Sequence, residues 1–141
     1  MLRLYRACRA FQDRLIEQLA ARLETLGYTR VTASHLTFLA ELECGENHAA
    51  ELARRTGISR QAVHKQVKEL AALGLLAERA DPHRRNQRTI VFTDRGTQLI
   101  ADCRAILAEM DADLPRDDGM TPDNAVSFLG LAAGRFGAGS D

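Results

Sequence analysis

The sequence predicts a mainly α-helical chain in which a helix-turn-helix and a two-stranded β-hairpin lie between two long helical regions. Three observations predict this. Apolar residues recur every three or four positions near both ends, a glycine-containing turn separates two short helical segments, and a β-branched run follows. The 141 residues suit one domain, and the 45% apolar and 27% charged residues are ordinary for a globular chain. No apolar run is long enough to span a bilayer.

The first long helix is expected over residues 2–26, and Gly27 is expected to end it. Apolar residues recur along one face of this helix: Leu4, Cys8, Phe11, Leu15, Leu19, Leu23 and Leu26. Thr32 is expected to cap the next helix, whose inner face carries Leu36, Leu39 and Ala40. The polar residues 43–47 indicate a turn after this second helix.

The central segment has the spacing of a helix-turn-helix. A short helix is expected from about residue 48 to residue 56, and Ser59 is expected to cap a second helix that ends near residue 73. Ala53 supplies the small residue at the helix crossing, and Gly57 tolerates the positive φ of a tight turn. The apolar residues expected to lock the second helix against the first are Ile58, Val63, Val67 and Leu70.

Two runs with strand character follow the helix-turn-helix. Residues 76–80 and 88–93 flank the polar, basic loop 81–87, which predicts a hairpin with a basic tip. A second long helix is expected to begin at Thr93 or Asp94 and to stop at Pro115. Thr121 followed by proline predicts the start of a last helix.

The charge of the chain is concentrated in its middle third. The formal net charge is zero, but residues 54–95 contain ten basic and four acidic residues and so carry a net charge of +6. Residues 1–53 carry a net charge of −1, and residues 96–141 carry −5. Because local charge decides what a surface attracts, the middle third is the candidate for contact with a polyanion.

The outward face of the second helix of the helix-turn-helix suits contact with double-stranded DNA. Its donor-capable side chains are Arg60, Gln61, His64, Lys65 and Lys68. Ser59 at the helix N-terminus suits a phosphate contact. Arginines at or near the hairpin tip suit an adjacent minor groove or the DNA backbone: Arg84, Arg85 and Arg88. The alternative interpretation is a solvated helix face beside a merely soluble loop.

Residues from about Thr32 to Gly96 resemble the MarR (multiple antibiotic resistance regulator) family of bacterial winged-helix repressors. The similar segments are residues 32–36, 51–60, 73–76 and the hairpin with its exit at 81–96. The resemblance implies one MarR-like domain over residues 1–141, with a winged helix-turn-helix DNA-binding region at 31–96 and a β-hairpin wing. It also implies long dimerisation helices at residues 1–30 and 97–141.

The resemblance further implies a homodimer that acts as a repressor at a pseudo-palindromic operator. Release would come from a small lipophilic or phenolic effector, or from oxidation. By similarity, Asp81 would pair with Arg85 in the wing. The effector cleft would lie where the first, second and fifth helices meet, lined by Phe11, Leu15, His35 and Phe38, although core packing explains these four residues equally well. Three residues depart from the family pattern: Asn47 and Gln66 stand at usually apolar positions, and Arg84 stands where Asp is common.

Signatures of other functions are absent from the sequence. It has no Gly-rich phosphate loop, no HExxH helix and no GxSxG elbow, so we expect no enzyme, no cofactor and no metal site. Cys8, Cys44 and Cys103 are expected to be buried, inert thiols, with redox sensing as the alternative. Three cysteines without a secretory start favour a cytoplasmic location. Two other functions stay open: a winged-helix protein-interaction module, and a redox- or metal-sensing regulator of the same fold.

Overall fold

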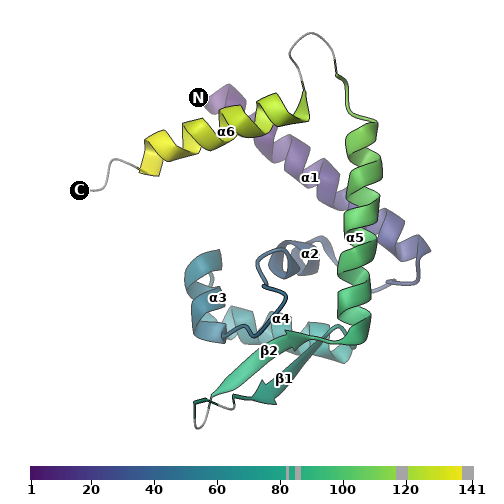
Figure 1. Cartoon of the computed structure of the whole chain (residues 1–141), viewed down its shortest axis with the longest axis vertical. Coiled ribbons are helices and arrows are strands. Elements are labelled where there is room, and N and C mark those ends of the chain that lie inside the picture. Colours follow the sequence, from purple (N-terminus) through teal and green to yellow (C-terminus); the bar gives the residue numbers. More distant parts are fainter. Residues whose placement is uncertain (82, 85–86, 117–120, 138–141) are drawn as a thin grey trace. The chain divides into compact units, whose positions relative to one another are not determined.

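The computed structural model describes residues 1–81, 83–84, 87–116 and 121–137, and the chain divides into two compact units, Met1–Arg104 and Ala105–Asp141. The first unit holds helices α1 to α4, the hairpin β1–β2 and the beginning of α5 (Figure 1). The second unit holds the end of α5 and α6. No helix in these described ranges is long and apolar enough to cross a membrane.

Helix α1 spans Leu2–Thr25, close to the predicted range. Gly27, with φ of 95°, turns the chain out of the helix. Only the last third of α1 is buried in the single chain, through Leu19 and Leu23. Large apolar side chains near its N-terminus are exposed, and Phe11 is 54% exposed.

Helix α2 spans Ala33–Leu39 and begins with the cap that the sequence predicted. The Thr32 hydroxyl accepts a hydrogen bond from the backbone N–H of His35, and the His35 ring accepts one from the backbone N–H of Thr32, both at 3.2 Å. This reciprocal pair is a capping box, and it satisfies two helix-end donors at once. The helix buries His35, Leu36, Phe38 and Leu39.

The helix-turn-helix consists of α3 (Ala49–Thr56) and α4 (Arg60–Ala72). Gly57 has a φ of 70°, and the Ser59 hydroxyl caps α4 by accepting from the backbone N–H of Ala62 at 3.1 Å. The side chains buried between the two helices and the core are Leu52, Val63, Val67 and Leu70. The prediction for Ile58 was wrong: it is 38% exposed, because it lies in the turn between the helices.

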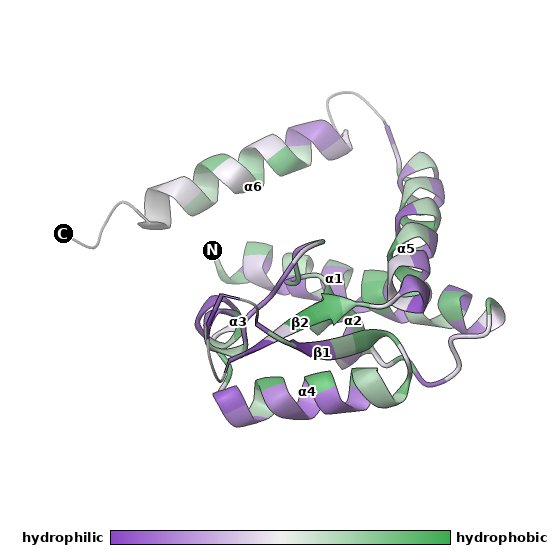
Figure 2. Cartoon of the chain, turned by 60° about the horizontal axis from the view of Figure 1, so that its bottom comes forward, coloured by the Kyte–Doolittle hydropathy of each residue, from purple (hydrophilic) through white to green (hydrophobic). Residues whose placement is uncertain are grey.

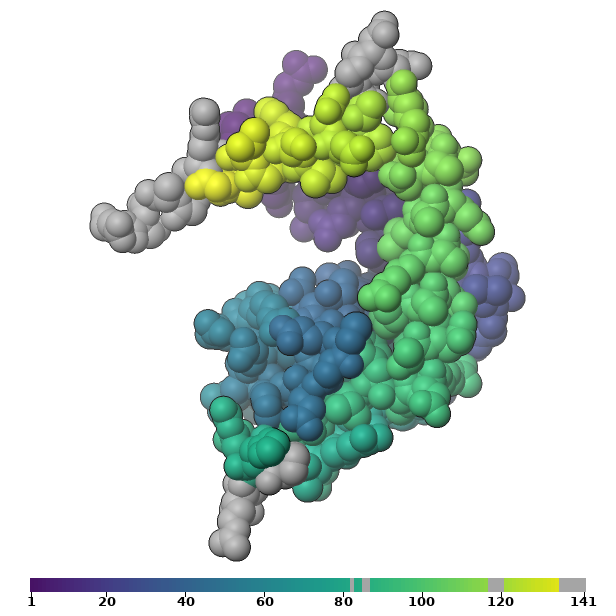
Figure 3. Space-filling view, in the orientation of Figure 1, coloured from purple at the N-terminus to yellow at the C-terminus, as the bar shows by residue number. Residues whose placement is uncertain are grey.

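Strands β1 (Leu76–Ala80) and β2 (Arg88–Phe92) pair antiparallel, with Leu76 opposite Phe92 and Ala80 opposite Arg88. The hairpin lies beside the segment that runs from α2 through the following loop to α3 (Figure 3). Asn47 forms an isolated antiparallel bridge with Ile90 of β2. Its backbone N–H donates to the Ile90 carbonyl at 3.0 Å, and its carbonyl accepts from the Ile90 N–H at 2.8 Å. Its buried amide also donates to the carbonyls of Glu43, Gly45 and Ile90. The amide of Asn47 therefore provides hydrogen bonds to three backbone carbonyls, which an apolar residue at this position could not provide.

Helix α5 (Asp94–Ala112) starts at a tight junction with the end of α4. The Thr93 hydroxyl donates to the Gly74 carbonyl at 2.6 Å and accepts from the backbone N–H of Gly96 at 3.0 Å. Gly96 lies directly on the Leu75 carbonyl, and a Cβ at position 96 would overlap that oxygen. The residue that was expected to extend the second strand or to begin the helix is thus the cap of α5.

Helix α6 (Pro122–Gly137) begins with the predicted Thr-Pro signal. The Thr121 hydroxyl accepts a hydrogen bond from the backbone N–H of Asn124 at 3.2 Å. Its large apolar side chains stand exposed in the single chain, and Leu131 is 75% exposed. The predicted long helices are therefore present, and much of their apolar surface is uncovered.

Candidate nucleic-acid interface

Helix α4 separates its residues onto two faces. Val63, Val67 and Leu70 point into the core and are fully or almost fully buried. The residues expected to contact DNA are exposed: Arg60, Gln61, His64, Lys65 and Lys68, with Ser59 exposed at the N-terminus. Because the helical period places these residues opposite the buried ones, hydrophilic and hydrophobic residues alternate around α4 (Figure 2).

The cations on the outer face of α4 are weakly engaged. Among the described residues, Arg60, His64 and Lys68 have no hydrogen-bond or ion-pair partner. Lys65 Nζ lies 3.9 Å from the Glu69 carboxylate, with 77% of the lysine side chain exposed. Exposed pairs of this kind contribute little energy. These cations are therefore available to an incoming anion.

Two of the three hairpin arginines lie within the described ranges. Arg88 donates to the Glu78 carboxylate at 3.2 Å, and Arg84 lies 3.5 Å from the Gln87 side-chain oxygen. Both arginines are exposed, whereas Arg85 lies outside the described residues. Sequence reasoning missed Arg79 on β1, an exposed cation without a partner among the described residues. The net positive charge of residues 54–95 was the available signal for it.

Asp81 shapes the beginning of the hairpin loop. Its proposed partner Arg85 lies outside the described residues, but the carboxylate accepts from the backbone N–H groups of His83 at 2.7 Å and Arg84 at 3.1 Å. Only 3% of the Asp81 side chain is exposed, and His48 Nε2 lies 3.9 Å away. The hydrogen bond from His83 is the main cause that lowers the Asp81 pKa. The ionised carboxylate thus holds the loop in a turn.

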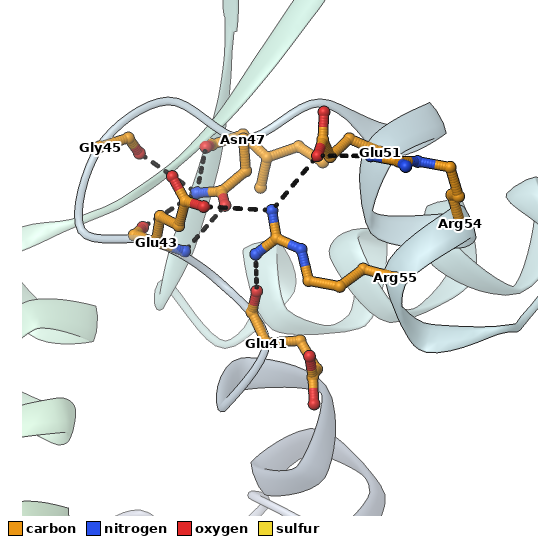
Figure 4. A network of polar contacts seen from close by, with 8 residues as sticks. Glu41, Glu43, Gly45, Asn47, Glu51, Arg54 and Arg55 are labelled. Carbon is orange, nitrogen blue, oxygen red and sulfur yellow. Dashed lines mark hydrogen bonds and ion pairs between the residues drawn. The ribbon is translucent and has the colours of Figure 1, made fainter. Parts of the chain in front are cut away.

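The arginines of α3 are occupied by neighbouring acidic residues (Figure 4). Arg55 donates to the Glu41 carbonyl at 2.8 Å and to the Glu43 carboxylate at 3.2 Å. Arg54 donates to the Glu51 carboxylate at 3.0 Å. The sequence counts both arginines in the basic block, but their charges are offset locally. In the described part of the basic block, exposed cations without an acidic partner therefore include Arg60 and Lys68 on α4 and Arg79 on β1.

The four candidate effector residues differ in how deeply they are buried. Phe11 is exposed on α1 and Leu15 is half-buried, whereas His35 and Phe38 are buried in α2. Both ring nitrogens of His35 have partners, the Thr32 N–H and a Glu69 oxygen at 3.0 Å. His35 therefore serves as a local hydrogen-bonding group, and lining of an effector cleft stays a prediction for all four residues.

The three cysteines differ in burial. Cys103 is buried, and burial is the main cause that raises its pKa to about 11, which favours the protonated thiol at neutral pH. Cys8 is half-buried. The expectation was wrong for Cys44, which is exposed because it lies in the loop before α3. No group of three or more metal-binding side chains comes together within the described part of the chain.

Comparisons with known proteins found a family model and several solved structures that resemble this chain. Residues 26–85 match the model of the MarR family, and no curated protein matches the sequence. Among solved structures, Rv1404 from Mycobacterium tuberculosis is similar at 18% identity and a TM-score of 0.68 over 95% of each chain. A MarR mutant from E. coli, complexed with operator DNA, is similar at 18% identity and a TM-score of 0.67 over 93% of this chain and 89% of that one.

A third similar structure is BpsR from Bordetella bronchiseptica, whose DNA binding is regulated by 6-hydroxynicotinic acid. It shares 19% identity and a TM-score of 0.62 over 100% of this chain and 94% of that chain. Identities this low establish a shared fold alone, and the family model matches residues 26–85, which are less than half of the chain. The chain therefore has the fold of these solved structures, and its residues 26–85 resemble the MarR family.

Proposed function

We propose that this protein is an effector-responsive transcriptional repressor that binds a pseudo-palindromic operator as a homodimer. The observation that carries the proposal is the outer face of α4, where Arg60 and Lys68 are exposed cations without a partner among the described residues. A cationic face of this kind, on the second helix of a helix-turn-helix, fits the major groove of DNA.

The side chains on α4 and the hairpin have distinct proposed roles. Arg60 and Gln61 suit base edges, since Arg pairs with guanine and Gln with adenine. Ser59, capping the helix N-terminus, suits a phosphate oxygen. The remaining contacts, to phosphates or to an adjacent minor groove, come from His64, Lys65, Lys68, Arg84, Arg85 and Arg88. The Glu78 partner of Arg88 is exchanged for phosphate at little cost, because the pair is exposed.

The homodimer is proposed from the uncovered apolar surface of the terminal helices. Phe11 on α1 and Phe128 and Leu131 on α6 are each more than half exposed in the single chain. Large apolar side chains that stay exposed along a helix typically mark an interaction surface. We propose that residues 1–30 and 97–141 pair two copies, and that residues 31–96 bind DNA. Two recognition helices then meet successive major grooves, about 34 Å apart.

The effector is proposed to be a small phenolic or lipophilic compound. The similar regulator BpsR responds to 6-hydroxynicotinic acid, a hydroxylated aromatic acid, which supports this class of ligand. The proposed site is the junction of α1, α2 and α5, at Phe11, Leu15, His35 and Phe38.

Selection of bound duplexes from random sequence tests the proposed function. We expect an enriched site with two inverted half-sites, and a binding constant that falls steeply as salt concentration rises. Sedimentation of the free protein should show a dimer. A protein-interaction module of the same fold would enrich no site, and its weak DNA affinity would show little dependence on salt.

A further inference from the structure

We propose that the first turn of α2 is a positioning element for the recognition helix α4, acting through contacts from His35 and Ser34 to Glu69 and Gln66. The inference rests on the proposed DNA binding by α4. It concerns residues that contact no DNA themselves but fix the angle at which the DNA-facing side chains are presented.

The first contact joins His35 to Glu69. The His35 ring is buried, and its Nε2 lies 3.0 Å from Glu69 Oε2 on α4. Its Nδ1 accepts the backbone N–H of Thr32, so the neutral ring carries its proton on Nε2 and donates it to Glu69. The capping box that begins α2 therefore also selects the tautomer that bonds α4.

The contact continues to the DNA-facing side of α4. The second oxygen of Glu69 lies 3.9 Å from Lys65 Nζ, one turn earlier in the helix. The hydrogen bond from His35 is the largest of the influences that lower the pKa of Glu69, and the charge of Lys65 adds to it. One carboxylate thus joins a buried group of α2 to an exposed cation proposed to contact phosphate.

An independent contact joins Ser34 to Gln66. Gln66 Nε2 donates to Ser34 Oγ at 2.8 Å, while Gln66 Oε1 is buried and has no partner among the described residues. Exchanging the amide oxygen and nitrogen would only leave the other atom unpaired. A buried unpaired polar atom costs stability, which an apolar residue here would avoid. A polar contact kept at this cost is consistent with fixing one orientation of α4.

Orientation matters more to base contacts than to phosphate contacts. Hydrogen bonds to base edges require donors in one geometry, whereas attraction to phosphates tolerates small rotations of the helix. Loosening the contacts between α2 and α4 should therefore lower the preference for selected sequence over random sequence, and leave binding to random sequence nearly unchanged.

Two variants at one position separate positioning from charge. Glu69→Gln and Glu69→Ala both remove the same negative charge, but only Gln keeps an acceptor for His35. His35→Gln removes the contact from the other side, and a Gln at this position can still close the capping box. The probes are a duplex selected from random sequence by the unmodified protein and a random duplex of equal length, with affinities measured by fluorescence anisotropy.

We expect Glu69→Ala to lower the selected-to-random affinity ratio about fivefold relative to Glu69→Gln, as is ordinary for coupled residues in contact. His35→Gln should lower the ratio similarly, and the double variant His35→Gln/Glu69→Ala should lower it no further. Because Glu69→Ala leaves the buried Nε2–H of His35 without an acceptor, it should unfold at a somewhat lower urea concentration than Glu69→Gln. The affinities are measured without urea, where circular dichroism should show that both variants are fully folded. That result separates positioning from a loss of folding.

Equal ratios for Glu69→Ala and Glu69→Gln would overturn the positioning role while leaving the proposed DNA binding in place. The positioning role would also be overturned if the two variants differed in their urea midpoints but not in their selected-to-random affinity ratios. If the unmodified protein binds neither duplex at low salt, the proposed function is overturned, and the positioning role with it.

Discussion

The helix-turn-helix and the terminal helices differ in how much of their apolar side chains a single chain buries. In α3 and α4, Leu52 and Val63 are completely buried within one chain. In α6, Val126 and Leu131 are largely exposed, as is Phe11 in α1. One region completes its own core, whereas the other presents apolar surface that a single chain leaves open. The difference teaches that the stability of the DNA-binding region and the pairing of two chains should be separable by mutation.

The largest expected effect lies in the self-contained region. Leu52→Ala should lower the free energy of unfolding by about 4 kcal/mol, because it removes a fully buried side chain and leaves a cavity. Urea unfolding followed by circular dichroism measures this loss. Ile58→Ala, in the exposed turn of the same motif, should cost about 1 kcal/mol or less. Similar losses for the two variants would contradict the burial difference between these positions.

A charge in the open apolar surface should act on assembly. Phe128→Asp should raise the dimer dissociation constant about 100-fold, which corresponds to about 2.7 kcal/mol, because a carboxylate would be buried at the interface. Sedimentation velocity over a range of protein concentrations measures the change. Ser127→Asp, at the adjacent exposed position, is the matched control. A Phe128→Asp protein that still sediments as the unmodified one would remove α6 from the proposed interface.

The recognition face should affect binding without affecting folding. Arg60→Ala should weaken binding to the selected duplex by about 1–3 kcal/mol and relax the preference at one base position, if Arg60 reaches a base edge. Anisotropy with base-substituted duplexes measures both quantities. Arg54→Ala is the control, since it removes the same charge from α3 instead of α4. Equal weakening by the two variants would mean that charge alone, and not placement on α4, determines affinity.

The smallest expected effect is a pH dependence within the first unit. Tyr28 donates to the Asp102 carboxylate at 2.7 Å, and burial followed by this hydrogen bond raises its pKa from 10.0 to about 12. A raised pKa means that folding favours the neutral phenol, so its contribution is complete below pH 10 and is lost as the pH rises toward 12. Tyr28→Phe should cost about 1 kcal/mol at neutral pH.

Urea midpoints measured from pH 8 upward check this prediction. The difference in urea midpoint between the unmodified protein and Tyr28→Phe should stay constant up to about pH 10 and shrink as the pH rises toward 12. A stability difference that stays constant with pH would show that the phenol ionises equally in the folded and unfolded chains.

The sequence predicted the helix bounds well because local signals set them. Thr32, Ser59 and Thr121 cap helices as expected, and Gly57 adopts the positive φ of the turn. The outward face of α4 followed from the helical period alone. These features depend on neighbours within a few residues, which a sequence displays directly.

The features that were missed depend on residues distant in sequence. Arg55 counted as free positive charge until the loop carrying Glu41 and Glu43 was seen to reach it. The bond from His35 to Glu69 crosses 34 positions. Asn47 stands at a position that is usually apolar, and its pairing with Ile90 of the hairpin explains why a polar residue fits there. Hydrophobic periodicity reports burial, but it does not report which polar atoms meet inside.

The seat of Gly96 on the Leu75 carbonyl has a mechanical consequence. A backbone oxygen cannot swing aside as a side chain does, and Thr93 ties the same place to Gly74 with its hydroxyl. We therefore expect the first turn of α5 and the residues that follow α4 to move together. A rotation of the start of α5 is therefore expected to carry Gly74 and Leu75, and with them the C-terminal end of α4, in the same direction.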